Sequence, residues 1–237
     1  MSVPRTGGTT KIPVRRVAWK PCFRIIPSRF PTVPLFERVA DPADLDAVLA
    51  VESLTNDRLR QEAGKISLVS PGDRVTGSGA SYIMAAFTHP APVGGRFTDG
   101  SFGAYYAAHD EATAIAETRY HRERFMSATQ QPAMELQMRV LIARLDGDLH
   151  DIRGRRSALP TIYDANSYEA SQHLARALRS TGSWGIAHDS VRHAGGECAA
   201  ILRPPVLSHC RQGRHFIYQW DGERIDAVFR KSLHVNS

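Results

Sequence analysis

A stretch of strictly alternating residues in the middle of the chain constrains the fold more than any other feature. In "AMELQMRVLIARL", residues 133–145, apolar side chains stand at the even positions from Met134 to Val140 and polar ones at the odd positions from Glu135 to Arg139. Successive side chains of a β-strand point to opposite faces of a sheet. The period of two therefore predicts a strand with one buried face and one face in water.

Other predicted elements surround this strand in a mixed order. Helices are expected over residues 41–64, 110–125 and 167–182, with caps at Asp41, Asp110 and Ser167. Short strands are expected at residues 21–30, 104–108, 185–190 and 198–202, and a final hairpin at residues 215–229, turning at Asp221-Gly222. The order contains no regular strand–helix–strand series and no internal repeat, which favours an α+β fold over a doubly wound sheet.

The bulk composition fits one large domain. The chain has 237 residues, of which 42% are hydrophobic and 23% are charged, as in ordinary globular proteins. We predict a single domain over residues 21–237, a basic N-terminal arm over residues 1–20 and a helical insertion at about 41–88. No run of about 18 apolar residues exists, and the first residues lack the apolar core of a secretory signal.

Cysteine usage and spacing indicate a cytoplasmic protein without a metal site. The three cysteines, Cys22, Cys198 and Cys210, are far apart and form no C-x-x-C pair. Reduced thiols are the rule in the cytoplasm, where disulfides do not persist. The cysteine and histidine spacings also match no closed tetrahedral zinc pattern.

The positive charge is concentrated at the start of the chain. The net charge is +6, and no acidic residue precedes Glu37. One interpretation is attraction to a polyanion such as nucleic acid, an acidic protein or a phosphorylated small molecule. The other is a solvated basic arm. A nucleic-acid-binding module would use this basic cluster, with Trp19 and Phe23 as stacking groups.

A double glycine followed by arginine is the first candidate site. In "GGRF", Gly94 and Gly95 permit positive φ and close approach of backbone N–H groups to a ligand. Arg96 adds a planar fork suited to phosphate. The segment can be a pyrophosphate clamp, or a glycine turn whose arginine points to solvent. It is not a P-loop, because the spacing of that motif is absent.

Glu117 and Ser190 are the other candidates. Glu117 lies at the edge of the apolar side of the helix predicted at residues 110–125. A positioned carboxylate can stabilise a cationic, sugar-like transition state or bind a ribose hydroxyl, and the alternative is a surface ion pair. Ser190 lies in "GIAHDSVRHAGGECAAI", between two predicted strands. Its hydroxyl can orient Glu117 or bind ribose, and no G-x-S-x-G motif supports a hydrolase nucleophile. His188 and His193 are interpreted as turn residues.

Taken together, these segments resemble the RES domain family, which is named for an Arg, a Glu and a Ser. The resemblance rests on "GGRF", "AYYAA" and "ATAIAET", followed by "GIAHDSVRHAGGECAAI", and on "CFRI" upstream. It spans roughly residues 22–205, with a gap across residues 41–88. Three departures exist. Phe97-Thr98 replace the Trp-Asn that often follows the family's arginine, and His188-Asp189 replace the Tyr-Pro that often precedes its serine. The long insertion before "GGRF" is unusual for short members of the family.

The resemblance implies a fold, an activity and partners. RES proteins are typically toxins of bacterial toxin–antitoxin modules, with an ADP-ribosyltransferase-like, split mixed sheet and peripheral helices. They consume NAD, and an antitoxin with a Xre-type DNA-binding domain blocks their active site. Cleavage of the nicotinamide–ribose bond then passes ADP-ribose to a protein, to water or to phosphate, and these acceptors remain open. No membrane and no direct nucleic-acid contact are expected.

The resemblance also implies residue roles. By position, Arg24 and Arg96 match the family's NAD-contacting arginines, with Gly95 beside them. Glu117 and Ser190 match its glutamate and serine, and Arg96, Glu117 and Ser190 are the expected catalytic set. Tyr106 matches the tyrosine of its second strand, and Tyr105 competes with Tyr106 for the role of stacking on the ligand.

Overall fold

Two groups of strands joined at short junctions form the centre of the molecule. The computed structural model describes residues 12–28, 36–37 and 64–232. Its seven strands are β1 (Val14–Pro27), β2 (Tyr105–Ala108), β3 (Met134–Asp151), β4 (Gly185–Asp189), β5 (Glu197–Ile201), β6 (Leu207–Trp220) and β7 (Ile225–Lys231). Its helices are α3 (Ala80–Thr88), α4 (Glu111–Ala128) and α5 (Glu169–Ser180), with short 3-10 turns at Ile66–Leu68, Pro71–Asp73 and Pro204–Val206.

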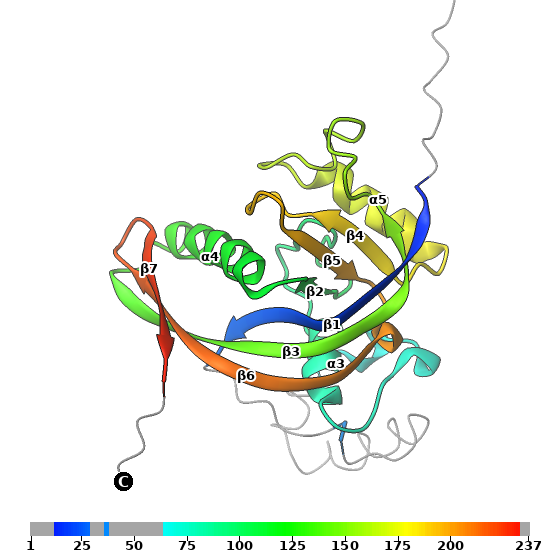
Figure 1. The fold of residues 1–237 in the computed structure, drawn as a ribbon, viewed down its shortest axis with the longest axis horizontal. Helices are drawn as coiled ribbons and strands as arrows, with labels where there is room; N and C mark the ends of the chain where they lie inside the picture. Colours follow the sequence, from blue (N-terminus) through cyan, green and yellow to red (C-terminus); the bar gives the residue numbers. More distant parts are fainter. Residues whose placement is uncertain (1–11, 29–35, 38–63, 233–237) are drawn as a thin grey trace, which may run out of the picture.

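The sheet order is β1-β2-β5-β4-β3-β6-β7, and β1 also pairs with β3. We call β1, β3, β6 and β7 the large half-sheet, and β2, β5 and β4 the small half-sheet (Figure 1). Between them, β1 and β2 share only the pair Phe23 and Ala108, and β3 and β4 pair only at His150 and Asp151. The prediction of an α+β fold with a split, mixed sheet is confirmed.

Each helix covers a different face of the sheet. Helices α3 and α4 lie on opposite sides of the large half-sheet, and α5 lies against the small half-sheet (Figure 1). The strand predicted at residues 133–145 is therefore covered on both faces over part of its length, instead of having one face in water throughout. Residues 138–141 are all buried, because Met138 and Val140 face the α4 side while Leu141 faces the α3 side. Alternation of buried and accessible residues resumes from Ala143 onward.

Two local predictions are confirmed, and one is wrong. Asp110 caps α4 as expected, since its carboxylate accepts the backbone N–H of Thr113 at 2.7 Å. The final hairpin also forms as predicted. Ser167, however, does not cap α5; the cap position is Tyr168, and the Ser167 N–H donates to Asp164 instead. The helix predicted at residues 41–64 lies almost wholly outside the described residues.

The expected boundary of the basic arm is also corrected. Residues 14–20 belong to β1, where they pair with β3, and strand β1 buries Val17 and Trp19. The described end of the expected insertion is likewise part of the core, since α3 packs beneath β6. No helix in the described ranges is long and apolar enough to cross a membrane.

The contact between α3 and β6 predicts a strong position effect for two nearby glycines. Gly77 and Gly79 have similar positive φ values, +85° and +81°. A Cβ at Gly79 would lie 1.8 Å from the Cys210 carbonyl oxygen, whereas a Cβ at Gly77 meets nothing within 4 Å. Gly77→Ala should cost about 1 kcal/mol of unfolding free energy through left-handed strain alone. Gly79→Ala should cost about 3 kcal/mol or more because the backbone must also move.

Urea unfolding of the two variants measures the difference. Equal losses for Gly77→Ala and Gly79→Ala would contradict the close packing of α3 on β6.

Candidate active site

Glu117 and Ser190 meet across the gap between the half-sheets. The Ser190 hydroxyl donates to Glu117 Oε1 at 2.6 Å, and Ser190 is almost fully buried. The same hydroxyl oxygen accepts the backbone N–H groups of Arg192 at 3.1 Å and His193 at 2.9 Å. A serine hydroxyl has one proton and two lone pairs. With both lone pairs engaged, its proton is directed at Glu117, which is the arrangement that an ionised carboxylate requires.

The turn that carries Ser190 is fastened to the first turn of α4. The His193 ring nitrogen Nδ1 lies 2.8 Å from the Thr113 hydroxyl, which donates to the capping carboxylate of Asp110. Gly196 makes this approach possible, since a Cβ there would lie 2.4 Å from Thr113 Oγ1. The prediction that His193 is a turn residue is confirmed. Glu117 therefore lies on a helix whose first turn is hydrogen-bonded to the loop that carries Ser190, the hydrogen-bond partner of Glu117.

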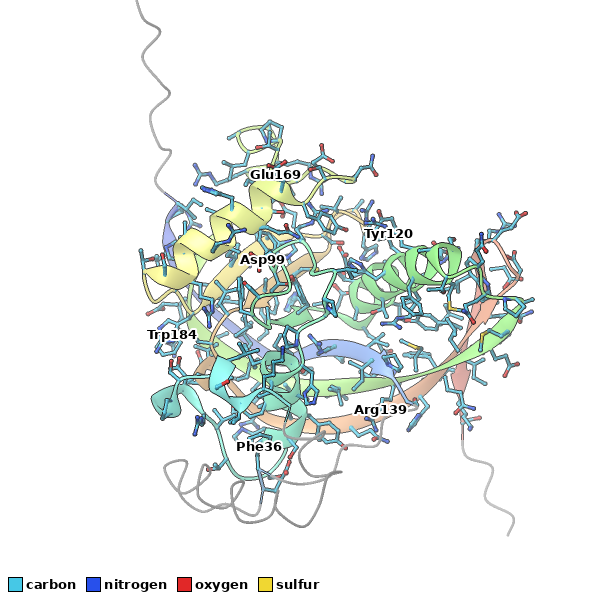
Figure 2. The ribbon with its side chains drawn as sticks, turned by 180° about the vertical axis from the view of Figure 1, so that it is seen from behind. Phe36, Asp99, Tyr120, Arg139, Glu169 and Trp184 are labelled. Carbon is cyan, nitrogen blue, oxygen red and sulfur yellow. The ribbon has the colours of Figure 1, made fainter. Side chains whose placement is uncertain are left out.

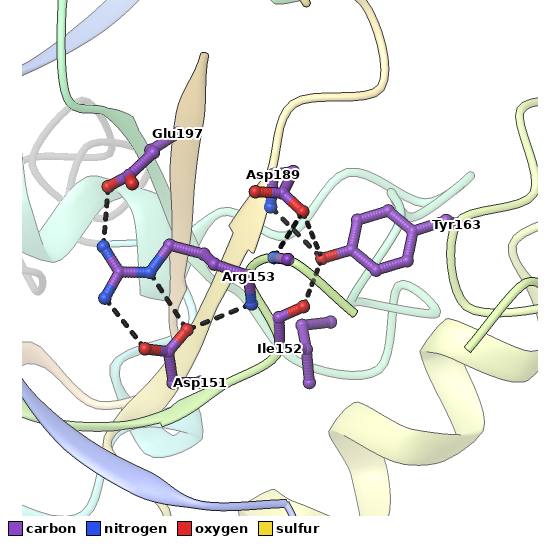
Figure 3. Close-up of polar contacts among 7 residues, drawn as sticks. Asp151, Ile152, Arg153, Tyr163, Asp189 and Glu197 are labelled. Atoms are coloured by element: carbon purple, nitrogen blue, oxygen red, sulfur yellow. Dashed lines mark hydrogen bonds and ion pairs between the residues drawn. The ribbon is translucent and has the colours of Figure 1, made fainter. Parts of the chain in front are cut away.

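A second network fixes the residue before Ser190. The Asp189 carboxylate accepts the Gly154 N–H at 2.8 Å, and the Asp189 N–H donates to the Tyr163 hydroxyl at 3.2 Å (Figure 3). The Tyr163 hydroxyl donates in turn to the Ile152 carbonyl at 2.7 Å. Arg153 bridges the carboxylates of Asp151 and Glu197 beside it. These contacts hold the end of β4 and the following loop in one position.

Arg96 is buried beside the Glu117–Ser190 pair, and its hydrogen-bond acceptors and ring partner are neutral groups. Its guanidinium donates to the carbonyls of Ile162 at 3.0 Å and Asp164 at 2.7 Å, and it lies 4.7 Å from the centre of the Tyr168 ring. Burial lowers the pKa of Arg96, while the nearby Glu117 carboxylate acts in the opposite direction. The structure thus brings Arg96, Glu117 and Ser190 together.

Gly95 and Tyr106 shape the turn that carries Arg96. We call this turn, which the pairing of Gly95 with Thr98 closes, the arginine turn. The Tyr106 hydroxyl accepts the Phe97 N–H at 3.0 Å and lies 3.2 Å from the Thr98 hydroxyl. A Cβ at Gly95 would lie 2.9 Å from that same tyrosine oxygen. The amide of Gln172 on α5 also donates to the Gly95 carbonyl at 2.9 Å. The contacts of its hydroxyl therefore hold Tyr106 against the arginine turn. Glycine is required at position 95 because the tyrosine oxygen leaves no room for a Cβ.

Arg24 and Tyr105 lie elsewhere. Tyr105 is fully buried in the core beneath β6, on the face of β2 opposite to Tyr106, so its ring cannot stack on a ligand. Arg24 stacks on that ring at 4.8 Å and donates to the Tyr106 carbonyl at 3.4 Å. Burial lowers the pKa of Arg24. Within the described part of the chain, no contact joins Arg24 to Arg96, Glu117 or Ser190.

His188 is a site-facing residue that sequence reasoning missed. It lies in β4 rather than in a turn, it is 5% exposed, and its ring packs 4.9 Å from that of Phe97. Its Nδ1 lies 3.0 Å from the Asp189 carbonyl, and its buried Nε2 has no hydrogen-bond partner among the described residues. Burial lowers the pKa of His188 to about 4, although the charge of Glu117 opposes this shift. His188 is therefore neutral near pH 7.

Four further residues border the site without having been predicted. They are Tyr120 and Arg124 on α4, Tyr168 before α5, and Arg192 after β4. Arg192 lies two residues after Ser190, and Tyr120 lies three residues after Glu117, which places it on nearly the same side of α4. Helical spacing from Glu117 was the signal that could have identified Tyr120.

A surface hollow adjoins these residues. It has a volume of about 610 Å³ and is lined by Asp164, Ser167 and residues of the start of α5, including Gln172 and Arg176. Gln172 and Asp164 are the same residues that hold the arginine turn. Across residues 12–28, 36–37 and 64–232, no group of three or more His, Cys, Asp or Glu side chains is arranged to hold a metal.

Comparison with known proteins gives matches to a family, a relative and a solved structure. The family model of the RES domain matches residues 73–221. An uncharacterized protein y4oC of Sinorhizobium fredii (strain NBRC 101917 / NGR234) is 30% identical over 207 residues, which cover 87% of this chain and 86% of that protein. A chain in the crystal structure of the M. tuberculosis MbcT–MbcA toxin–antitoxin complex is similar with a TM-score of 0.47 and 13% identity, over 88% of this chain and 87% of that one.

The buried, neutral His188 predicts a specific dependence of stability on pH. The unfolded chain protonates this residue near pH 6.5, whereas the folded protein does so only near pH 4. Stability should therefore fall as the pH drops through this window, by about 3 kcal/mol in total from this residue. His188→Asn keeps a donor for the Asp189 carbonyl and removes the titration, so its unfolding free energy should fall less steeply between pH 6.5 and 4.

Urea unfolding at several pH values provides the measurement. His209→Asn is the matched control, because His209 is exposed and its φ of 52° suits asparagine. An unchanged pH dependence in His188→Asn would show that His188 does not remain neutral in the folded protein.

Proposed function

This chain belongs to the RES domain family, and we propose that it is a toxin that consumes NAD by cleaving the bond between nicotinamide and ribose. The observation that carries the proposal is the hydrogen bond from Ser190 to Glu117, with the Arg96 guanidinium close enough to interact electrostatically. An oriented carboxylate next to a guanidinium suits a substrate that joins an incipient sugar cation to a pyrophosphate. NAD is such a substrate.

The chemistry needs only one carboxylate. Glycosidic cleavage usually employs a second carboxylic acid to protonate the leaving group. Nicotinamide is positively charged in NAD and leaves as a neutral molecule, so no proton has to be supplied. The role proposed for Glu117 is to hydrogen-bond the ribose hydroxyls and stabilise positive charge on the ribose as the bond breaks. Ser190 holds one carboxylate oxygen and thereby fixes the orientation of the other.

Arg96 is proposed to bind the pyrophosphate, and Tyr106 to support it. Because the phenol of Tyr106 is engaged by the Phe97 N–H, its contribution is to position the arginine turn. Direct packing on nicotinamide is the alternative for the accessible part of the Tyr106 ring. Neither role requires Tyr105.

The partner and the acceptor follow from the family. We propose that a Xre-type antitoxin neutralises the protein by covering this site. The ADP-ribose goes to a protein side chain, to water or to phosphate. Incubation of a lysate with labelled NAD separates these outcomes: a discrete labelled protein band indicates transfer to protein, and free ADP-ribose or its phosphorylated form indicates NAD degradation.

The competing nucleic-acid-binding function loses support in the described part of the basic segment. Trp19, one of its two stacking groups, is only 5% exposed. Arg16 and Lys20 form ion pairs with Asp146 at 2.8 Å and 3.6 Å. Bases need an accessible ring and phosphates need uncompensated charge.

Replacement of Glu117 tests the proposed function. Glu117→Gln keeps the size of the side chain but removes the negative charge, so NAD cleavage should fall by about a hundredfold or more. Growth inhibition on expression should disappear with it. Mass analysis of NAD and nicotinamide after mixing with purified protein gives the rate, and thermal unfolding verifies that the variant folds.

Glu135→Gln makes the same chemical change at an exposed residue of β3 and should retain the parent rate. A folded Glu117→Gln protein that cleaved NAD as fast as the parent would remove Glu117 from the reaction. Parent protein that left NAD intact would refute the proposed activity.

A further inference from the structure

Guanidinium groups and phenol rings alternate along one side of the candidate site. Arg96 lies 4.7 Å from the centre of the Tyr168 ring, and Arg124 lies 5.8 Å from the same ring. Arg124 is also 5.8 Å from the Tyr120 ring, whose face carries Arg192 at 3.3 Å. We call these five residues the arginine–tyrosine ladder. It connects the arginine turn, the start of α5, helix α4 and the loop after β4.

The ladder comes close to Glu117 at Arg96, which interacts electrostatically with both the Glu117 carboxylate and Arg192. Figure 2 shows Tyr120 on the side of α4 that faces the segment leading to α5, and its hydroxyl donates to the Ala165 carbonyl at 3.4 Å. Arg192 also donates to the Ala165 carbonyl. Arg192 and Arg96 are close enough that each disfavours the charge of the other, and Arg192 acts with burial to lower the pKa of Arg96.

The three arginines of the ladder have only neutral partners. Their described contacts are aromatic rings and the carbonyls of Ile162, Asp164 and Ala165, and they form no ion pair with the described acidic residues. The Asp164 carboxylate is near Arg96 but accepts the N–H groups of Asn166 and Ser167 instead. Three positive charges therefore stand near two carboxylates, Glu117 and Asp164, without an ion pair to either.

This arrangement leaves the correct edges available for an anion. The described hydrogen bonds of Arg96 use Nη1 and that of Arg192 uses Nη2, so the other N–H groups of each guanidinium can donate to phosphate oxygens. Arg96 is buried and Arg192 is half-buried, so repulsion between their guanidinium groups costs free energy until an anion compensates it, whereas Arg124 is exposed. A pyrophosphate carries two negative charges, which can compensate guanidinium groups that lack an ion pair.

We propose that the arginine–tyrosine ladder is the pyrophosphate-binding site, with Arg124 and Arg192 supplying the guanidinium groups that Arg24 was expected to provide. The assignment rests on the proposed NAD chemistry of the same site and specifies the residues that hold the dinucleotide. Arg24 is unsuited to the task because it stacks on Tyr105 and donates to the Tyr106 carbonyl, without a contact to the Glu117 pair.

Binding of ADP, which has the pyrophosphate but no nicotinamide, tests the proposal. Titration calorimetry with the full chain should show ADP bound about tenfold or more weakly by Arg124→Gln and by Arg192→Lys, since each loses a charge-assisted or bidentate contact. Arg119→Gln, also on α4 but in an exposed pair with Glu123, should bind ADP like the parent. Arg24→Gln should do so as well if it remains folded.

Thermal unfolding distinguishes a role of Arg124 in ADP binding from a purely structural role. Without ADP, Arg124→Gln should unfold at the parent temperature, and only the increase caused by ADP should shrink. Parent affinity for ADP in both ladder variants would overturn the proposal, as would a parent protein that binds no ADP. If NAD is cleaved while the ladder variants keep their ADP affinity, the ladder fails and the proposed function stands. If ADP binding depends on the ladder but NAD is not cleaved, the ladder stands and the reaction fails.

Discussion

The hydrogen bond between Ser190 and Glu117 joins two parts of the molecule that the backbone connects weakly. Helix α4 lies over the large half-sheet, whereas Ser190 follows β4 of the small half-sheet. The backbone pairing between these half-sheets amounts to one residue pair at one junction and two at the other. Side-chain contacts across the gap therefore determine its geometry, and those from His193 to Thr113 and from Ser190 to Glu117 are the central ones.

This dependence explains why the supporting contacts are so dense around Ser190. Its carbonyl accepts Arg156 at 2.7 Å, its N–H donates to the Gly196 carbonyl at 2.8 Å, and its hydroxyl makes three further hydrogen bonds. A carboxylate that must stabilise developing charge gains most when its orientation is fixed beforehand, because reorganisation then costs little. Ser190 thus orients the Glu117 carboxylate, and the hydrogen bonds of the surrounding loop orient Ser190.

Local sequence patterns predicted what local physics determines. The cap at Asp110, the helix after it and the final hairpin depend on residues within a few positions of one another. Strand β1 extends further than predicted because its first half is stabilised by pairing with β3 and by ion pairs to Asp146, which lie over 120 positions away. Helix α3 lies inside the helical insertion expected at about 41–88, but it was not predicted as a separate helix although Ala80, Ile83, Met84 and Phe87 have helical spacing.

The site residues also divide into those that the sequence identified and those that depend on packing between distant segments. Arg96, Glu117 and Ser190 come together, as their family resemblance implied, but Tyr105 and Tyr106 could be separated only by knowing which face of β2 meets the core. The roles of His188 and Arg192 depend on packing between β4, the arginine turn and α4. No spacing rule within one segment gives that information.

The choice of neutral partners for the arginines is itself informative. A carboxylate beside Arg96, Arg124 or Arg192 would neutralise the guanidinium and repel an anionic substrate, whereas tyrosine rings and carbonyls orient the group and leave its charge intact. Glu117 lies near Arg96 without such an ion pair, at the position that we propose for the positive sugar. The Ser190 hydroxyl, rather than an ion pair with an arginine, holds one oxygen of this carboxylate.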